Sequence, residues 1–301
     1  MNILIAGATG FIGKNLSLKL LEKGFNVYAL TRNPDKKFSE KIKFILWDGK
    51  EIKEEIKENL YGIINLAGEN IFSFFYNNKK KRKIIESRVN SVRAIYEFIK
   101  RKNIKPEVLI QASATGYYGN SYEEKDENSP SGKGFLSKVC VEWEKESEKF
   151  EELGIRRCVI RIGIVLGKWG FLSKFFPFLK FPFLPFIGKK ENYISFIDIE
   201  DLINGIIFLL ERKNSKGIYN FVSPNYLKAQ EFYETFAKVF NKKLIKIPDF
   251  IFKIFMGEMA EEIIFFNNRV IPKKLLEENF KFLFPDLESI LSRLKKDIFS
   301  G

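Results

Sequence analysis

The sequence predicts an α/β fold: a Rossmann-type, doubly wound parallel sheet with a smaller, mostly helical C-terminal domain. Short apolar runs alternate with helical stretches through the first half of the chain, which is typical of parallel strands joined by helices. Three glycines spaced G-x-x-G-x-x-G, over residues 7–13, lie between the first apolar run and the first helical stretch. The length of 301 residues suits one large α/β unit, or a nucleotide domain with a smaller partner.

Six apolar runs supply the strands of the predicted sheet, because strands buried on both faces are continuously apolar rather than alternating. Helical stretches are expected at 79–101 and 135–153, and a late strand at about 216–222. A further helix is expected over 202–210, with Asp201 as its N-cap. The six runs cover residues 2–6, 27–30, 43–47, 62–66, 107–111 and 157–161.

The second part of the chain has a different composition. We predict that residues 1–168, rejoined by the late strand, form a dinucleotide-binding domain, and that 169–204 and 225–301 form the C-terminal domain. Phe171–Phe186 is crowded with phenylalanine and interrupted by three prolines. Because proline ends a helix, this segment is predicted to be a folded-over apolar loop.

Composition excludes several classes of site. The chain contains no histidine, which removes imidazole bases, Ser-His-Asp triads and histidine-containing zinc sites. Cys140 and Cys158 lack C-x-x-C spacing, so we expect buried, reduced thiols and no metal site.

Charge and hydropathy restrict the partners. The formal charge is +13, and its densest run is Lys79–Lys83. Glu86 follows on the same helical stretch, which favours a solvated basic face, or an entrance that attracts phosphates, over a nucleic-acid site. The first strand begins at residue 2, and no run approaches the ~18 apolar residues of a membrane span. We therefore expect a cytoplasmic protein without a transmembrane segment.

The glycine motif predicts a pyrophosphate site. Gly7, Gly10 and Gly13 let the backbone approach the phosphates, and the helix that follows points its first amides at them, so Thr9, Phe11 and Ile12 are also predicted contacts. NAD-preferring folds place an acidic residue about 20 residues past the glycines, where it bonds the ribose hydroxyl. Here that place holds Thr31 and Arg32. An arginine pairs with a 2′-phosphate instead, so the cofactor is predicted to be NADP rather than NAD.

Several motifs, in order, resemble the extended short-chain dehydrogenase/reductase superfamily of the NAD(P)-dependent epimerase/dehydratase kind. The chain is most similar to the branch of epimerase family proteins that carry a C-terminal DUF1731 domain, which would begin here at about residue 250. Each motif is weak alone, but their order and spacing together are specific. They are G-A-T-G-F-I-G at 7–13, N-L-A-G-E-N at 65–70, E-S-R-V at 86–89, S-A-T-G-Y-Y-G at 113–119, S-P-x-G at 129–132, F-L-x-x-V-C-x-x-W-E at 135–144, R-x-G-x-V-L-G at 161–167, S-F-I at 195–197, G-E-M-A-E at 257–261, R-V-x-P at 269–272 and F-P at 284–285.

The resemblance implies further cofactor contacts. The small residues Leu66-Ala67-Gly68 would pass beneath the cofactor, although a merely tight strand exit is the alternative. Val165 would line the same site. Asp48 would contact adenine, or would simply form a turn before Gly49.

By the same resemblance, Arg88 occupies the helix position where most extended relatives carry a structural asparagine near the active site. The resemblance implies a contact with a phosphate of the cofactor or of the substrate, with Lys83 one turn earlier. The alternative is a surface salt bridge between Arg88 and Glu86.

Catalysis is the part that the resemblance does not carry over. Ordinary members use a Tyr-x-x-x-Lys pair with a Ser or Thr at the end of the fifth strand; Ser113 matches the latter, but Phe135 and Val139 replace the pair. Tyr117 is the nearest remaining phenol, as proton donor or only as a pocket wall. Tyr76 has a lysine four residues later, at Lys80, but precedes the fifth strand and is interpreted as a chance match.

We therefore expect an NADP-binding, epimerase/dehydratase-like oxidoreductase that acts on an unidentified small molecule. The alternative is an NADP(H)-binding redox-responsive or structural protein without turnover. Relatives close their pocket with the region after the sixth strand, here Phe171–Phe186, so an apolar or aromatic ligand is expected. A homodimer is compatible with the sequence.

Overall fold

A seven-stranded parallel sheet forms the centre of the molecule. The computed structural model describes residues 1–33, 35, 37–54, 56, 58–71, 76–257 and 259–299. The strand order is β12-β7-β5-β4-β1-β2-β3. Successive strands are added on one side of β1 up to β3 and on its other side from β4 onward, so the topological switch point lies between β1 and β4. In sequence order the strands are β1 (Asn2–Ala6), β2 (Asn26–Thr31), β3 (Lys43–Leu46), β4 (Gly62–Asn65), β5 (Val108–Ala114), β7 (Arg156–Ile162) and β12 (Gly217–Phe221).

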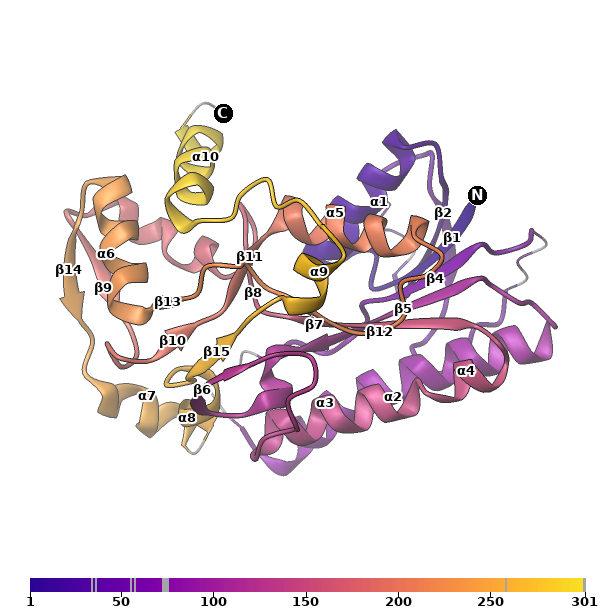
Figure 1. Ribbon diagram of the computed structural model, residues 1–301, viewed down its shortest axis with the longest axis horizontal. Coiled ribbons are helices and arrows are strands. Elements are labelled where there is room, and N and C mark those ends of the chain that lie inside the picture. Colours follow the sequence, from indigo (N-terminus) through magenta and orange to yellow (C-terminus); the bar gives the residue numbers. More distant parts are fainter. Residues whose placement is uncertain are drawn as a thin grey trace.

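Helices cover both faces of this sheet, as Figure 1 shows. On one face lie α1 (Phe11–Glu22) and α5 (Ile199–Glu211); on the other lie α2 (Asn78–Arg101), α3 (Phe135–Glu146) and α4 (Lys149–Glu152). Strands β1 and β4 are almost entirely buried, as continuous apolar runs require. The predicted Rossmann-type fold is therefore confirmed.

Short strand pairs and helices make up the rest of the chain. It lies at the other end of the molecule from the N-terminus, on the left of Figure 1. Its strands pair as β6 (Ser121–Lys125) with β15 (Asn268–Val270), β8 (Ile164–Leu166) with β11 (Phe196–Asp198), β9 (Phe183–Phe186) with β14 (Lys243–Lys246), and β10 (Tyr193–Ile194) with β13 (Leu227–Lys228). Its α-helices are α6 (Ala229–Phe240), α7 (Asp249–Met256), α8 (Met259–Ile263), α9 (Lys273–Glu277) and α10 (Leu287–Phe299), and short 3-10 helices are η1 (Thr115–Tyr118), η2 (Leu172–Lys174) and η3 (Phe176–Lys180).

Two details of the predicted helices were wrong. The stretch expected at 135–153 is broken at Ser147, whose hydroxyl donates to the Glu144 carbonyl and closes α3. Helix α5 is capped by Asp198, which accepts from the Glu200 amide at 2.7 Å, and not by Asp201. The Asp201 carboxylate instead accepts from the backbone of the segment before α10.

The phenylalanine-rich segment forms part of a second core rather than a simple loop. Phe175 and Phe186 are buried against α6, where Phe175 meets the Phe236 ring with centroids 5.6 Å apart. Helix α10 closes the same core. These two rings are buried by packing, whereas Phe178 and Phe181 of the same segment are exposed. An apolar or aromatic ligand stays a prediction. The domain boundary near residue 168 stays a prediction.

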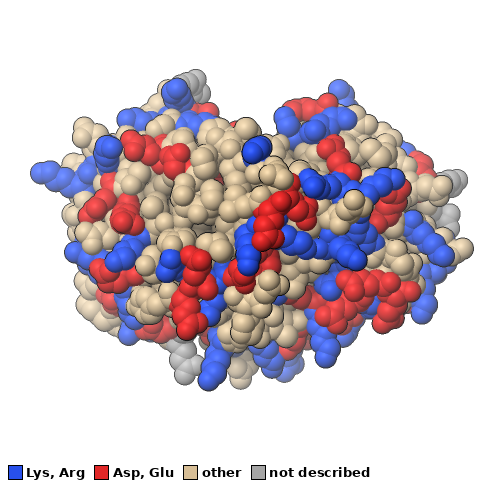
Figure 2. Space-filling view, in the orientation of Figure 1, with Lys and Arg blue, Asp and Glu red and all other residues tan. Residues whose placement is uncertain are grey.

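Charges of both signs are finely mixed on one face of the molecule (Figure 2). On the face in Figure 2, Lys and Arg side chains are interspersed with Asp and Glu side chains rather than gathered by sign. Within the described parts of the chain, every helix is too short or too polar to cross a bilayer. Cys140 and Cys158 are buried and unbridged, as expected.

Candidate functional site

The turn between β1 and α1 has the close backbone approach that the glycines predict. Gly7 has φ +81°, and a Cβ there would lie 2.8 Å from the Leu66 carbonyl. A Cβ on Gly13 would lie 2.2 Å from the Gly7 carbonyl oxygen. Among the described residues no side chain caps α1, its first turn carries no acidic residue, and Thr9 and Gly10 are exposed. The first amides of α1 are therefore left for an anion.

The segment after β8 lies over the start of α1. A Cβ on Gly170 would come within 2.9 Å of the Phe11 ring and 3.5 Å of the Val165 carbonyl oxygen. Phe11, Ile12 and Val165 are half-buried. The fold thus brings these predicted contacts to the crevice at the carboxyl ends of the strands, where ligands of open α/β sheets bind.

Arg32 follows the end of β2 as an exposed cation. The Thr31 side chain is buried, and its hydroxyl donates to the Asn33 carbonyl at 2.9 Å, which forms a tight turn. Arg32 itself makes no ion pair or hydrogen bond to another described residue. The Lys14 ammonium lies 5.6 Å from the Phe38 ring centroid, which places this loop beside α1.

Asp48 forms a turn, the second of the two alternatives for this residue. Its Oδ1 accepts from the amides of Lys50 at 2.7 Å and Glu51 at 2.8 Å, and these bonds lower the pKa of the carboxyl. Gly49 has φ +87°, as a turn of this kind requires. A contact between Asp48 and adenine stays a prediction.

Arg88 does not pair with Glu86, so that alternative is wrong. Its Nη1 donates to the carbonyls of Glu69 at 3.1 Å and Ile84 at 3.0 Å, and its guanidinium lies 5.1 Å from the Trp143 ring centroid. Burial lowers the pKa of Arg88 below its usual value against the attraction of the Glu69 carboxylate, and within the described chain no carboxylate forms an ion pair with it.

Lys83 is drawn to the same loop. Its ammonium lies 3.4 Å from the Glu69 carboxylate, which Lys80 also contacts at 3.0 Å. The Lys83 side chain is nevertheless 62% exposed, and its contact with a phosphate stays a prediction. Lys80, the lysine four residues after Tyr76, is thus paired with the Glu69 carboxylate.

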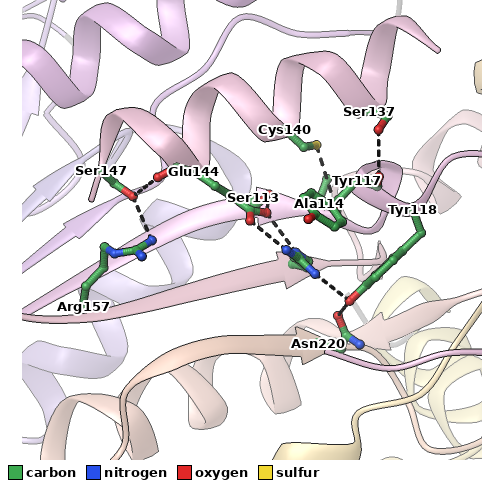
Figure 3. Close-up of polar contacts among 11 residues, drawn as sticks. Ser113, Ala114, Tyr117, Tyr118, Ser137, Cys140, Glu144, Ser147, Arg157 and Asn220 are labelled. Atoms are coloured by element: carbon green, nitrogen blue, oxygen red, sulfur yellow. Dashed lines mark hydrogen bonds and ion pairs between the residues drawn. The ribbon is translucent and has the colours of Figure 1, made fainter. Parts of the chain in front are cut away.

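A buried polar network lies behind Ser113 (Figure 3). Ser113 Oγ donates to Glu144 at 2.5 Å, and Glu144 accepts two parallel bonds from Arg161, at 2.9 and 2.8 Å. Arg161 Nη1 donates to the Tyr118 hydroxyl at 2.9 Å, which donates to Asn220 at 2.7 Å. Against the opposing effect of burial, Glu144 raises the pKa of Arg161, whereas burial raises that of Tyr118 to about 12. The network is a fixed structural unit under the end of β5.

Tyr117 differs from its neighbours in this network. The Arg161 guanidinium lies 3.3 Å from the Tyr117 ring centroid, and the Tyr118 ring meets it edge-on at 5.3 Å. The Tyr117 side chain is half-buried, and its hydroxyl makes no hydrogen bond to another described residue. The Tyr117 ring is therefore held in place, while its hydroxyl is available to bond a ligand.

Helix α3 carries apolar packing where ordinary members carry their pair. Val139 is 3% exposed, and Phe135 is half-buried with the Lys81 ammonium 5.4 Å from its ring centroid. Burial raises the pKa of the Cys140 thiol to about 11, so this cysteine stays neutral and inert at physiological pH. Val139 is thus a core residue, whereas Phe135 stays partly accessible at the start of α3.

Sequence reasoning missed two contributions to this region. The first is the Glu144–Arg161 pair. It could have been inferred only from the pairing of β5 with β7, which sets Arg161 opposite Ser113. The second is Glu262 of α8, whose carboxylate accepts from the first amides of α3, at Phe135 (2.9 Å) and Leu136 (2.7 Å). A hollow of about 690 Å³ that includes Met1 lies at the amino ends of the strands, away from all of these residues.

Comparison with known proteins agrees with this architecture. The profile of the NAD dependent epimerase/dehydratase family matches residues 3–221, and that of DUF1731, a domain of unknown function, matches 247–294. The epimerase family protein YfhF of Bacillus subtilis (strain 168) is 34% identical over 302 residues, covering 99% of each chain. The epimerase family protein SAR0825 of Staphylococcus aureus (strain MRSA252) is 30% identical, over 97% of this chain and 98% of that protein.

Solved structures show the same fold. Human epimerase family protein SDR39U1 (isoform 2), crystallised with NADPH, superposes with a TM-score of 0.89 at 25% identity, covering 99% of this chain and 100% of that one. The UDP-glucose 4-epimerase of Thermus thermophilus, in complex with NAD, gives 0.78 at 18% identity, over 100% and 99%. The chain belongs to the NAD dependent epimerase/dehydratase family.

Proposed function

We propose that this chain binds NADP(H) and acts as an epimerase/dehydratase-like oxidoreductase on a small molecule. The observation that carries the proposal is the uncapped start of α1 behind Gly7 and Gly13, which leaves backbone donors for a pyrophosphate. The choice of NADP rests on Arg32, an exposed cation at the end of β2 where NAD-preferring folds carry an acid. That the human relative was crystallised with NADPH supports the same choice.

The remaining contacts follow the course of the sheet. With the pyrophosphate at α1 and the 2′-phosphate at Arg32, the adenine half lies over β2 and β3, near Asp48. The nicotinamide half then lies beyond β4, over the backbone of Leu66, Ala67 and Gly68, and beside Val165.

Bound NADP(H) would supply the hydride-transfer chemistry. Tyr117 is the proposed proton donor or acceptor, because its ring is held against Arg161 and its hydroxyl is unspent. The Ser113 hydroxyl donates its hydrogen bond to Glu144. Toward a ligand, the Ser113 oxygen can therefore only accept a hydrogen bond. Ser113 therefore orients a hydroxyl or amide N–H, whereas Tyr117 carries the proton.

The cofactor assignment is tested by an Arg32→Asp variant. Titration of the full-length protein with NADPH and NADH, followed by nicotinamide fluorescence, should show a preference for NADPH that the variant inverts. Loss of one bidentate phosphate contact should weaken NADPH binding about tenfold or more. Lys23→Asp, at the far end of α1, is the matched control and should leave both affinities unchanged. Equal affinities in wild type and the Arg32 variant would contradict the role of Arg32.

A second function is favoured by one observation: Phe135 and Val139 leave α3 without a proton-transfer pair. In that case the chain would be an NADP(H)-binding protein without turnover. The two are separated by incubating the NADPH-loaded protein with a panel of aldehydes and ketones and recording nicotinamide absorbance. Turnover that a Tyr117→Phe variant abolishes supports the enzyme; NADPH binding with no turnover supports the second function.

A further inference from the structure

Arg88 has an unused hydrogen-bonding edge. Its Nη1 donates to two carbonyls, whereas Nε and Nη2 make no hydrogen bond to a described residue. This free edge lies against Gly68, where an added Cβ would stand 3.2 Å from Nη2 and 3.3 Å from Nε. Gly68 is exposed, so its lack of a side chain leaves the guanidinium edge uncovered. In the described chain the Glu69 carboxylate attracts Arg88 only at a distance and forms no ion pair with it, so an anion at the free edge would offset the desolvation of this half-buried cation.

Tyr76 carries a second unpaired donor, and its phenol interacts electrostatically with the Arg88 guanidinium. Its hydroxyl is enclosed and has no hydrogen-bond partner among the described residues, and its ring packs on the cluster of Met256, Ala260 and Phe265. Burial raises the pKa of this phenol to about 12 against the opposing charge of Arg88, so the hydroxyl keeps its proton and can donate it. Glu262, which also faces Tyr76, is already engaged by the amides of α3.

The position of these donors indicates which anion they serve. If the pyrophosphate binds at α1 and the 2′-phosphate at Arg32, the phosphates of NADP(H) already have partners on the β1 and β2 side. Arg88 comes from α2, beyond β4, and lies over Trp143 of α3. This is the nicotinamide half of the crevice, where the substrate must bind for hydride transfer.

We propose that Arg88 and Tyr76 bind an oxyanion of the substrate, a carboxylate or a phosphate, beside the nicotinamide. The inference rests on the proposed function. The Nε/Nη2 edge of an arginine fits two oxygens of such a group in parallel, and the Tyr76 hydroxyl would give a third bond. The substrate is then an acid or phosphate ester with its reacting carbon next to the charged group.

The test uses the full-length protein loaded with NADPH, titrated with three probes: pyruvate, its neutral isostere pyruvamide, and inorganic phosphate. Binding is followed by calorimetry and by the fluorescence of bound NADPH. Either pyruvate or phosphate should bind at least about tenfold more tightly than pyruvamide, and which of them binds identifies the anion. Arg88→Met should weaken that anion about tenfold or more, Arg88→Lys by less, and Tyr76→Phe about threefold.

A matched control is Arg93→Met, on the same helix, where Arg93 is exposed and pairs with Glu146. It should change neither anion nor NADPH binding. Circular dichroism confirms that each variant folds; if Arg88→Met does not, Arg88→Lys and Tyr76→Phe carry the test.

Three outcomes would overturn the inference. The first is that pyruvamide binds as tightly as both anions, and the second is that no anion binds up to about 50 mM, which is weaker than any useful affinity. The third is that the Arg88 variants weaken NADPH itself by about tenfold, which would assign the anion to the cofactor. Failure of the wild type to bind NADPH would instead refute the proposed function, and the inference with it.

Discussion

The two ends of the predicted site, the β1–α1 turn and helix α3, differ in which predicted features they contain. At the turn, Gly7 and Gly13 retain the close backbone contacts and the open amides that a dinucleotide requires. In α3, Phe135 and Val139 stand where the sequence predicts the reactive pair of ordinary members, and the helix is held by packing and by the Glu144–Arg161 network. Binding that uses the backbone survives many side-chain changes, whereas proton transfer depends on a few side chains that can be lost while the fold remains.

The largest effect is expected from Glu144→Ala, which tests whether α3 has become structural. The change would leave the 1% exposed Arg161 side chain buried without its partner. We expect a loss of about 3–5 kcal/mol in the free energy of unfolding, measured by urea denaturation.

The control for this variant is Glu142→Ala on the same helix. The Glu142 side chain is 39% exposed and lies 3.8 Å from Lys138, so its loss should change stability by no more than about 0.5 kcal/mol. A Glu144→Leu/Arg161→Met double variant should recover much of the loss, since an apolar pair avoids the desolvation cost. Equal losses in Glu144→Ala and Glu142→Ala would mean that the buried pair does not stabilise α3.

An intermediate effect is expected from Gly13→Ala, which tests the turn. The new Cβ would displace the Gly7 carbonyl and with it the first amides of α1. NADPH affinity, measured by fluorescence titration, should fall about a hundredfold, or about 2.7 kcal/mol.

Gly24→Ala is the matched control for this turn. Gly24 has φ +82° at the other end of α1, and no described atom lies within 4 Å of its Cβ position. This variant should cost about 1 kcal/mol of stability through backbone strain while leaving NADPH affinity intact. If both glycine variants bound NADPH like the wild type, the cofactor would have to lie elsewhere.

The smallest effect is expected from Phe135→Tyr, which returns a phenol to the usual position. Phe135 is half-buried at the first turn of α3, so we expect a stability change of at most about 0.5 kcal/mol by thermal unfolding. No turnover should be gained, because Val139 still replaces the lysine. A rise of about tenfold in NADPH oxidation, corresponding to ~1.4 kcal/mol, would show that α3 still presents that position to the substrate.

Local patterns predicted the parts of this molecule that depend on neighbouring residues. The strand from Asn2 to Ala6, the glycine turn and the uncapped α1 are all encoded within about 20 residues. Their roles in binding the cofactor remain predictions, but their geometry follows directly from the glycine spacing.

Features that depend on distant partners could not be predicted. Phe171–Phe186 resembled a lid, because its covering helices α6 and α10 lie tens of residues further along the chain. Asp198 and Asp201 are equally good caps by composition, and only the segment before α10, which occupies Asp201, decides between them. Arg88 has one partner on its own helix, the Ile84 carbonyl, but Glu69 and Trp143 come from other parts of the chain.

The bond from Glu262 to the start of α3 has a consequence for how the protein forms during synthesis. The first amides of α3 find their acceptor more than a hundred residues later, and β6 finds its partner only at β15. N-terminal domains commonly fold as soon as they leave the ribosome. Here the first amides of α3 lack this acceptor until residues 259–270 have emerged. Truncation before α8 should therefore yield a chain in which the helix layer of α2, α3 and α4 is incompletely packed, rather than a smaller functional domain.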